Sequence, residues 1–366
     1  MNITQEAVLK ALSTVEEPDL KKDLVTLNMV DKISVDGNKV SFTIILTTPA
    51  CPLKELIRRS CEEAIHQHIN KNIEVTVNLT AEVTSTRFGT TPVLPKVKNI
   101  IAVASGKGGV GKSTVTSNLA MALAKSGANV GLLDADIFGP SIPTMFGVEG
   151  GRPEVAEVNG KNMIIPIDSL GIKIISMGFL APAENAVVWR GPMASKALTQ
   201  FLGDTLWDEL DYLLIDLPPG TSDIHLTLVQ SVPVTGVVIV TTPQKVALDD
   251  AIKGVAMFRQ PQINVPVLGV VENMAYFTPA ELPGNKYYIF GKDGGKQLAQ
   301  RFGTPFLGEI PLVQGIREGG DNGVPAVETA DEATVLAFES LAQSVARQVA
   351  LRNASKPKTQ RVEIKV

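Results

Sequence analysis

The sequence predicts an α/β protein in which a mainly parallel sheet, flanked by helices, follows a small α+β domain. Beyond residue 98, near-continuous apolar runs alternate with helical patterns, as is typical of parallel strands that are buried on both faces. Glycine-rich or acidic segments directly follow several of these runs. Because ligands of such sheets bind at the carboxyl ends of the strands, we expect the functional site there.

The small domain is predicted from a hairpin and a helix. Residues 30–46 read as two strands joined at Asp36-Gly37, a dipeptide that favours a tight hairpin turn. A helix is expected from Pro52 to about His68, because proline is favoured at the first position of a helix. The predicted segments are a small α+β domain (1–85), a linker (86–97), the large α/β domain (98–352) and a flexible tail (353–366).

Composition and charge exclude several classes of protein. The formal net charge of −4 over 366 residues gives no basic surface for nucleic acid. No uncharged apolar run approaches the ~20 residues of a membrane-spanning helix. The N-terminal stretch lacks the features of a signal peptide, and two cysteines cannot form a disulfide framework. We therefore expect a cytoplasmic protein with no nucleic-acid and no membrane partner.

The strongest motif is SGKGGVGKST at residues 105–114. It fits the pattern G-x-x-x-x-G-K-[ST] between a predicted strand and a predicted helix. The glycines let backbone N–H groups surround phosphate oxygens, the helix N-terminus favours anions, and the serine hydroxyl can hold Mg²⁺. A turn that binds nothing is the alternative, but the flanking strand and helix favour a P-loop NTPase. The predicted ATP-binding residues here are Gly106, Lys107, Gly108, Gly109, Val110, Gly111, Lys112, Ser113 and Thr114.

Further polar positions follow other predicted strands. Asp216 ends the run YLLID, and a carboxylate beside a P-loop is suited to hold Mg²⁺ together with Ser113. Gly220 could donate its backbone N–H to the γ-phosphate of ATP. Asp134 and Asp136 follow another strand, and either could orient the water that attacks the phosphate or could instead cap a helix.

Several stretches together resemble a known family. KGGVGKST, DADIFGPS, IDLPPGTSD and VVENM resemble the deviant Walker A ATPases, which include MinD, ParA and the nitrogenase iron protein. Within that group, LLDADIFGPSIP, VVWRGPM and TTPQKVAL resemble the Mrp/ApbC iron–sulfur cluster carriers, over nearly all of residues 97–345. TTPACPLKELI resembles the small iron–sulfur assembly domain that is often fused ahead of this ATPase.

The resemblance implies a homodimer that hydrolyses ATP slowly, with Lys107, Lys112 and Asp136 as catalytic residues. Lys107 would reach the nucleotide of the partner chain and act as an arginine finger does. A solvated lysine on a flexible loop is the alternative for Lys107. The resemblance also implies that Asp136 positions the attacking water and that Asn273 contacts adenine.

The sequence departs from this family at its cysteines. The carriers commonly have a C-x-x-C pair after ENM-x-YF, so that two chains supply four thiolates to one [4Fe–4S] cluster. Here the stretch ENMAYFTPAELPGNKYYIFG has none, and the chain contains only Cys51 and Cys61. Cys51 precedes Pro52 at a predicted helix N-terminus, where the dipole favours a thiolate, so it is the candidate iron–sulfur ligand. A buried structural cysteine is the alternative for Cys51 and the preferred interpretation of Cys61.

The sequence therefore predicts an ATPase that carries iron–sulfur clusters to apoprotein clients. ATP, Mg²⁺ and an iron–sulfur cluster are the expected cofactors, and iron–sulfur assembly factors are expected partners. One alternative is an ATP-dependent positioning switch like MinD or ParA. Another is an adaptor that binds clients without any metal and uses its ATPase to time their release.

Overall fold

The computed structural model describes residues 3–87, 93–180, 191–279, 281–282 and 284–362. The chain forms two compact units. The first consists of Met1–Thr84 with Ala350–Lys356, and the second of Ser85–Val349 with Pro357–Val366.

The first unit is a three-stranded sheet with two helices, and it includes the predicted hairpin and the predicted helix. Its main elements are α1 (Gln5–Leu12), β3 (Val30–Asp36), β4 (Lys39–Leu46), α2 (Lys54–His68) and β5 (Glu74–Ala81), with the short strands β1 (Glu16–Glu17) and β2 (Lys22–Asp23). β3 and β4 form the predicted antiparallel hairpin, and β5 pairs with β4 in parallel. α2 begins at Lys54, two residues later than expected, with Leu53 as its N-cap. The core of this unit includes Leu12, Phe42, Ile44, Ile57, Cys61 and Ile65, which are fully buried.

The second unit is built on an eight-stranded sheet with the order β10-β11-β7-β12-β6-β13-β14-β15. All neighbouring strands are parallel except the antiparallel pair β10 and β11. The strands are β6 (Val97–Ser105), β7 (Val130–Asp134), β10 (Ile167–Ser169), β11 (Ile172–Ser176), β12 (Leu210–Asp216), β13 (Gly236–Thr241), β14 (Val267–Glu272) and β15 (Phe306–Glu309). A separate hairpin consists of β8 (Val155–Val158) and β9 (Lys161–Ile164). The mainly parallel sheet is therefore confirmed.

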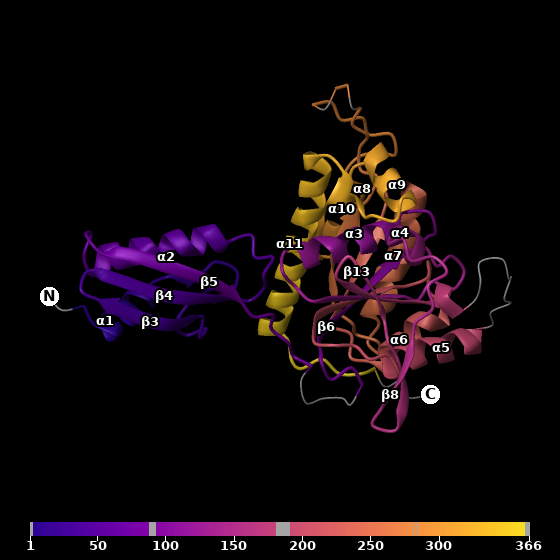
Figure 1. Ribbon diagram of the computed structural model, residues 1–366. Coiled ribbons are helices and arrows are strands. Elements are labelled where there is room, and N and C mark those ends of the chain that lie inside the picture. Colours follow the sequence, from indigo (N-terminus) through magenta and orange to yellow (C-terminus); the bar gives the residue numbers. More distant parts are fainter. Residues whose placement is uncertain (1–2, 88–92, 181–190, 280, 283, 363–366) are drawn as a thin grey trace. The chain divides into compact units, whose positions relative to one another are not determined.

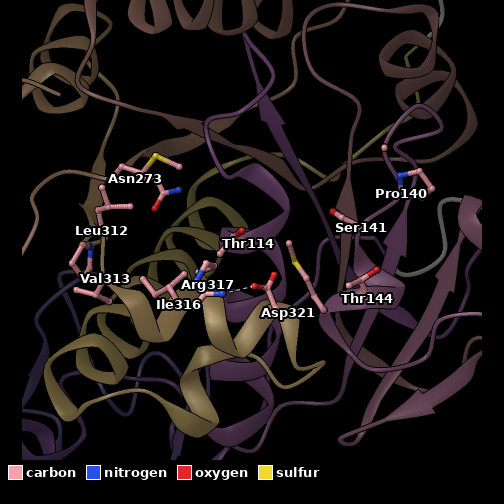
Figure 2. Close-up of a pocket in the computed structure, with 15 residues that line it drawn as sticks. Thr114, Pro140, Ser141, Thr144, Asn273, Leu312, Val313, Ile316, Arg317 and Asp321 are labelled. Carbon is pink, nitrogen blue, oxygen red and sulfur yellow. Dashed lines mark hydrogen bonds and ion pairs between the residues drawn. The ribbon is translucent and has the colours of Figure 1, made fainter. Parts of the chain in front are cut away.

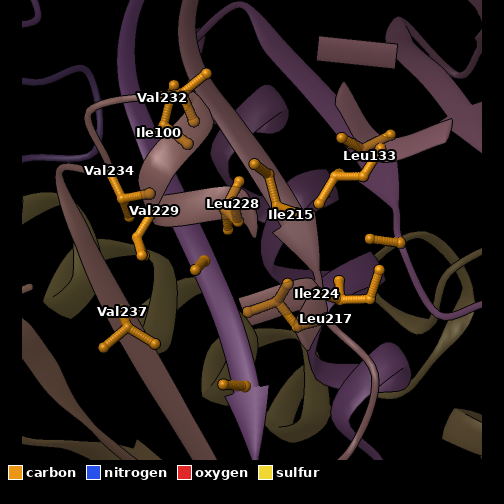
Figure 3. Close-up of a cluster of buried hydrophobic side chains, with 14 of the residues drawn as sticks. Ile100, Leu133, Ile215, Leu217, Ile224, Leu228, Val229, Val232, Val234 and Val237 are labelled. Carbon is orange, nitrogen blue, oxygen red and sulfur yellow. The ribbon is translucent and has the colours of Figure 1, made fainter. Parts of the chain in front are cut away.

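Helices cover both faces of this sheet (Figure 1). They are α3 (Lys112–Lys125), α4 (Ile142–Met145), α5 (Gly191–Gly203), α6 (Asp223–Ser231), α7 (Lys245–Arg259), α8 (Gly294–Arg301), α9 (Gln314–Asp321), α10 (Ala326–Thr329) and α11 (Glu332–Ser355), with the 3₁₀ helix Met177–Leu180. Ile100 of β6 and Ile215 of β12 pack with Leu228 of α6 in one buried cluster, shown in Figure 3. α3 contacts β6, β7 and β12, but its buried side chains lie outside that cluster, so it covers the opposite face. Alternation of side chains along a strand allows β6 to serve both faces.

The structure differs from the sequence prediction at the linker and the tail. The last predicted linker residue, Val97, is already part of β6, and the buried Arg87 donates a hydrogen bond to the Val97 carbonyl oxygen. α11 continues to Ser355, and further on the Val362 N–H donates to the Val229 carbonyl oxygen at 2.9 Å. Backbone hydrogen bonds and side-chain packing thus extend into segments whose composition predicts a linker and a tail. Over the described ranges, none of the helices combines the length and the apolar character needed to cross a membrane.

Candidate nucleotide site

The predicted phosphate-binding loop connects β6 to α3, and it is packed too closely to accept side chains at Gly106 and Gly111. Gly111 has a left-handed φ of 76°, and a Cβ there would lie 2.2 Å from the side-chain nitrogen of Asn273. A Cβ on Gly106 would lie 2.1 Å from the backbone carbon of Asp250 in α7. Larger residues at these two positions would therefore displace the loop from its neighbours.

Three side chains of α3 converge on one carboxylate at the end of β12. Asp216 is fully buried and accepts hydrogen bonds from Lys112 Nζ at 2.7 Å, Ser113 Oγ at 2.5 Å and Thr116 Oγ1 at 2.7 Å. Lys112 is itself only 6% exposed, so each buried charge is compensated by the other. The structure thus brings together Lys112, Ser113 and Asp216. It adds Thr116, which lies one turn after Ser113 on the same face of the helix.

Asp136 completes this cluster from the loop after β7. Its Oδ2 lies 3.7 Å from Lys112 Nζ, and its Oδ1 is buried without a hydrogen-bond partner among the described residues. Burial raises the pKa of the Asp136 carboxyl, and the Lys112 ammonium opposes this shift. Lys112 Nζ also lies 3.2 Å from Ser113 Oγ, so one ammonium group is surrounded by hydroxyl and carboxylate oxygens. Mg²⁺ binds oxygen ligands and keeps several waters, so these donors fit a magnesium site.

Asp134 is close to the cluster but uses its oxygens within the protein. It is fully buried and accepts hydrogen bonds from the backbone N–H groups of Asp136 and Ile142 and from the Ser176 hydroxyl. Burial, together with the nearby Asp216 carboxylate, raises the pKa of Asp134. Of the two aspartates considered from the sequence, only Asp136 therefore has an oxygen without a protein partner in the described part of the chain.

Lys107 and Gly220 are placed differently from the residues of the cluster. The side chain of Lys107 is exposed, whereas Lys112 of the same loop is buried. The Ser105 hydroxyl fixes the backbone at this point by donating to the Lys107 carbonyl oxygen at 3.0 Å. The Gly220 N–H donates to the Ser105 carbonyl oxygen at 2.8 Å. The predicted contact between Gly220 and the γ-phosphate would therefore require that hydrogen bond to break.

A cavity of about 590 Å³ opens beside the phosphate loop (Figure 2). Thr114 and Asn273 line it together with apolar side chains that include Leu312, Val313 and Ile316. The Asn273 side chain donates to the Val110 carbonyl oxygen at 2.8 Å, so it also holds the phosphate-binding loop in place. Apolar walls with a few polar groups are typical of sites for flat aromatic ligands such as a purine.

The sequence analysis missed the apolar wall of this cavity. Its residues lie in the stretch IPLVQGI, which directly follows β15. A position just beyond a parallel strand was therefore the available signal. Most of the VVWRGPM motif, residues 187–190, lies outside the described residues.

Burial opposes the thiolate form of both cysteines. Burial raises the pKa of the half-buried Cys51 thiol, although the Leu53 backbone lowers it, and the carboxylates of Glu17 and Asp19 add to the increase. The backbone at the helix N-terminus thus favours a Cys51 thiolate, as expected, but burial opposes the thiolate more strongly. Cys61 is fully buried in the core, and burial raises its pKa to about 12. In the described part of the chain, no three His, Cys, Asp or Glu side chains are grouped in a way that could hold a metal ion.

Two family models match this chain. One, described as NUBPL iron-transfer P-loop NTPase, matches residues 96–348, and one described as iron-sulfur cluster assembly protein matches residues 5–78. An iron-sulfur cluster carrier protein of Synechocystis sp. is 48% identical over 351 residues, which cover 95% of this chain and 99% of that protein. The carrier protein of Deinococcus radiodurans is 46% identical and covers 96% of this chain and 97% of its own.

Solved structures agree with these matches. A nucleotide-binding protein of Archaeoglobus fulgidus in complex with ADP is 42% identical, with a TM-score of 0.56 over 65% of this chain and 91% of that one. The cell division ATPase MinD of Pyrococcus furiosus is 25% identical, with a TM-score of 0.50 over 68% of this chain and 98% of that one. Both likenesses confirm the predicted P-loop NTPase fold. The chain therefore belongs to the family of NUBPL iron-transfer P-loop NTPases.

Proposed function

We propose that this protein binds and hydrolyses ATP with Mg²⁺ and uses the nucleotide to carry iron–sulfur clusters to client apoproteins. One observation carries the nucleotide half: Lys112 Nζ lies 2.7 Å from Asp216, 3.2 Å from Ser113 Oγ and 3.7 Å from Asp136. The cargo half is supported by likeness over 95% of the chain to a protein named as an iron-sulfur cluster carrier. A homodimer in the cytoplasm, assisted by iron–sulfur assembly factors, is part of the proposal.

Binding of ATP exchanges partners around Lys112. Its ammonium is paired with the carboxylate of Asp216, and a triphosphate would compete for the same ammonium group. The Ser113 hydroxyl would coordinate Mg²⁺, and Asp216 would hold waters of the ion's shell. The ion would neutralise charge on the phosphates. Asn273 and the apolar wall at Leu312 and Val313 would enclose the adenine.

Hydrolysis requires a water in line with the γ-phosphate. The unpartnered Oδ1 of Asp136 can accept a hydrogen bond from that water and turn its lone pair toward phosphorus. A bond then forms from the water oxygen to the γ-phosphorus, the bond to the bridging oxygen breaks, ADP leaves, and a proton of the water passes to an oxygen of the released phosphate. Lys107 of a second copy would stabilise the charge that develops on the phosphates, which agrees with the exposure of this side chain.

The cluster is cargo, and this chain supplies few ligands for it. Cys51 of each of two copies would provide two thiolates, and a small thiol or the client would provide the rest. The half-buried position of Cys51 supports this choice over Cys61, which is fully buried. The raised pKa of both thiols favours the competing function, an adaptor that binds clients without metal.

Anaerobic reconstitution of the full chain tests the proposal. Iron and sulfide are measured after desalting, ATP turnover is followed in the same sample, and transfer is scored on an apoenzyme whose activity needs a [4Fe–4S] cluster. We expect bound iron and sulfide in equal amounts, ATPase activity, and activation of the apoenzyme. ATPase activity without bound iron would favour the adaptor. A chain that binds no ATP would contradict the nucleotide half.

A further inference from the structure

We propose that Asp134 is a positioning residue for ATP hydrolysis, because it fixes the backbone of the loop that carries Asp136. This inference rests on the proposed function, in which Asp136 orients the attacking water. Asp134 itself touches neither water nor phosphate in this proposal. It acts through Asp136.

The loop between β7 and α4 is fastened at both ends by the one Asp134 carboxylate. Its Oδ1 accepts a hydrogen bond from the Asp136 N–H at 3.1 Å, and its Oδ2 accepts one from the Ile142 N–H at 3.3 Å. Ile142 is the first residue of α4, so the same carboxylate satisfies a donor that the helix itself leaves unpaired. The exit from β7 and the entry to α4 are therefore tied to a single buried group.

A neighbouring strand holds that group in turn. The Ser176 hydroxyl of β11 donates to Asp134 Oδ2 at 2.9 Å, and it accepts a hydrogen bond from the Gly178 N–H at 2.9 Å. In the sheet, Asp134 is paired with Ser176 of β11 on one side and with Asp216 of β12 on the other. Asp134, Ser176 and Asp216 are all fully buried. The anchor is therefore part of the rigid centre of the sheet.

Apart from Lys112 and Asp216, the Asp136 carboxylate interacts with backbone groups of Gly139 and Phe138 in its own loop, which lower its pKa. Its Oδ2 is 3.7 Å from the Lys112 ammonium, which is longer than a hydrogen bond, and its Oδ1 has no partner in the described part of the chain. Phe138 at the tip of the loop is 84% exposed, whereas its neighbour Ile137 is buried in the core of the unit. The position of Asp136 is therefore set by its backbone. Asp134 holds that backbone by the Asp136 N–H itself, in addition to the Ala135 N–H bond to the Asp216 carbonyl oxygen and the buried Ile137 side chain.

A double-mutant cycle distinguishes positioning from a general structural role. Asp134→Asn keeps the size of the side chain but replaces one accepting oxygen with a donor. We expect kcat to fall at least about 10-fold, with the affinity for a fluorescent N-methylanthraniloyl ATP within about threefold of wild type. In an Asp136→Asn background the same substitution should cause no further loss, because it acts through Asp136. Asp168→Asn, which removes a carboxylate from an exposed ion pair with Lys173, is the matched control.

A milder variant and a second readout complete the test. Ser176→Ala should lower kcat about threefold, and that loss should also vanish in the Asp136→Asn background. Hydrogen exchange of the full chain should show faster exchange at the Asp136 and Ile142 amides in Asp134→Asn. If Asp134→Asn does not fold, the Ser176→Ala cycle decides.

Additive losses in these cycles would overturn the inference, and so would an unchanged kcat in a folded Asp134→Asn chain. A wild-type chain without ATPase activity would overturn the proposed function and this inference together. An active wild type with an unaffected Asp134→Asn variant would overturn the inference alone.

Discussion

Helices α3 and α2 both begin beside a group that could carry or bind negative charge, but their surroundings differ. At α3, the buried Lys112 and the hydroxyl of Ser113 meet the carboxylate of Asp216. At α2, Cys51 lies three residues before the first helical residue, Lys54, and burial raises the pKa of its thiol. Both helices offer unsatisfied N–H groups and a favourable dipole at this end.

The difference shows that a helix N-terminus by itself does not make an anion site. The dipole is worth roughly 0.3–1 kcal/mol at an exposed end, whereas burial of an ion without a partner costs far more. At α3 the lysine supplies the compensating charge. At α2 the nearby charges include the carboxylates of Glu17 and Asp19, which oppose a thiolate. The sign of the effect is therefore decided by burial and neighbouring charge.

Replacement of Lys112, the buried cation at the start of α3, should have the largest effect of the changes considered. Lys112→Ala leaves the phosphates without their main side-chain partner, so we expect ATP affinity to fall at least about 100-fold, which corresponds to roughly 3 kcal/mol. Calorimetric titration with ATP and Mg²⁺ measures it. The substitution also leaves Asp216 buried without its cation, which typically costs about 3–5 kcal/mol of stability, so circular dichroism must confirm folding.

Lys125→Ala is the matched control, because Lys125 ends the same helix and makes an ion pair with Glu328. We expect its ATP affinity to stay within about twofold of wild type, since the pair is partly exposed. A folded Lys112→Ala chain with wild-type affinity would show that the α3 site binds phosphate without its buried cation.

The exposed lysine of the same loop should affect turnover rather than binding. Lys107→Ala should lower kcat at least about 100-fold and leave ATP affinity within a few-fold, because it acts on charge that develops in the transition state. Mixing it with Asp136→Ala chains in equal amounts should restore about one quarter of wild-type activity. Half of the dimers are then mixed, and each has one intact composite site.

Lys253→Ala, which breaks an exposed ion pair with Asp250, is the control for the mixing experiment. Failure to recover activity at any mixing ratio would argue that Lys107 does not act on a partner's nucleotide.

Light scattering with ATP and Mg²⁺ should also show a larger dimer fraction for Asp136→Ala than it does with ADP.

The α3 site could be predicted from sequence because its residues are local or end apolar strands. The motif around Lys112 indicates that a helix begins there. Asp216 ends an apolar run that is typical of a buried strand. The role of Asp134 could not be predicted, since a hydrogen bond from Ser176 depends on strand order. The apolar cavity wall could not be predicted either, because Leu312 lines the cavity together with Thr114, which is far away in the sequence.

The α2 site could not be predicted for a physical reason of a different kind. The predicted start of the helix after Cys51 was nearly right, since α2 begins at Lys54 rather than at Pro52. The state of its thiol depends on burial in the tertiary structure and on the carboxylates of Glu17 and Asp19. Helical spacing gave the correct result for Cys61, because the apolar face of a helix is a local pattern.

Replacement of each cysteine in turn tests which sulfur near α2 binds iron. After anaerobic reconstitution, Cys51→Ser should lose most of the bound iron, roughly three-fold or more, because it removes the less buried sulfur of each chain. Cys61→Ala is the matched control, since it removes the other thiol, which is buried within α2, and we expect its iron content to be nearly unchanged. Absorption and Mössbauer spectra measure the cluster. A full complement in the double variant would place the ligands elsewhere.

The smallest expected effect is the pH dependence of thiol alkylation. The thiolate is the reacting form, so a raised pKa slows reaction near neutral pH and moves the rise in rate to higher pH. We expect iodoacetamide to modify Cys51 several-fold more slowly at pH 8 than a small free thiol, and Cys61 more slowly still, because its pKa is raised to about 12 in a fully buried site.

A folded-state pKa above the unfolded value means that the neutral Cys61 thiol adds stability at neutral pH. That contribution is lost as the pH rises from the ordinary thiol pKa toward the raised one. Mass spectrometry after timed alkylation gives both rates, and the difference in urea midpoint between wild type and Cys61→Ala should shrink above pH 9. Faster alkylation of Cys51 than of the free thiol at pH 8 would mean that the helix N-terminus, and not burial, controls this sulfur.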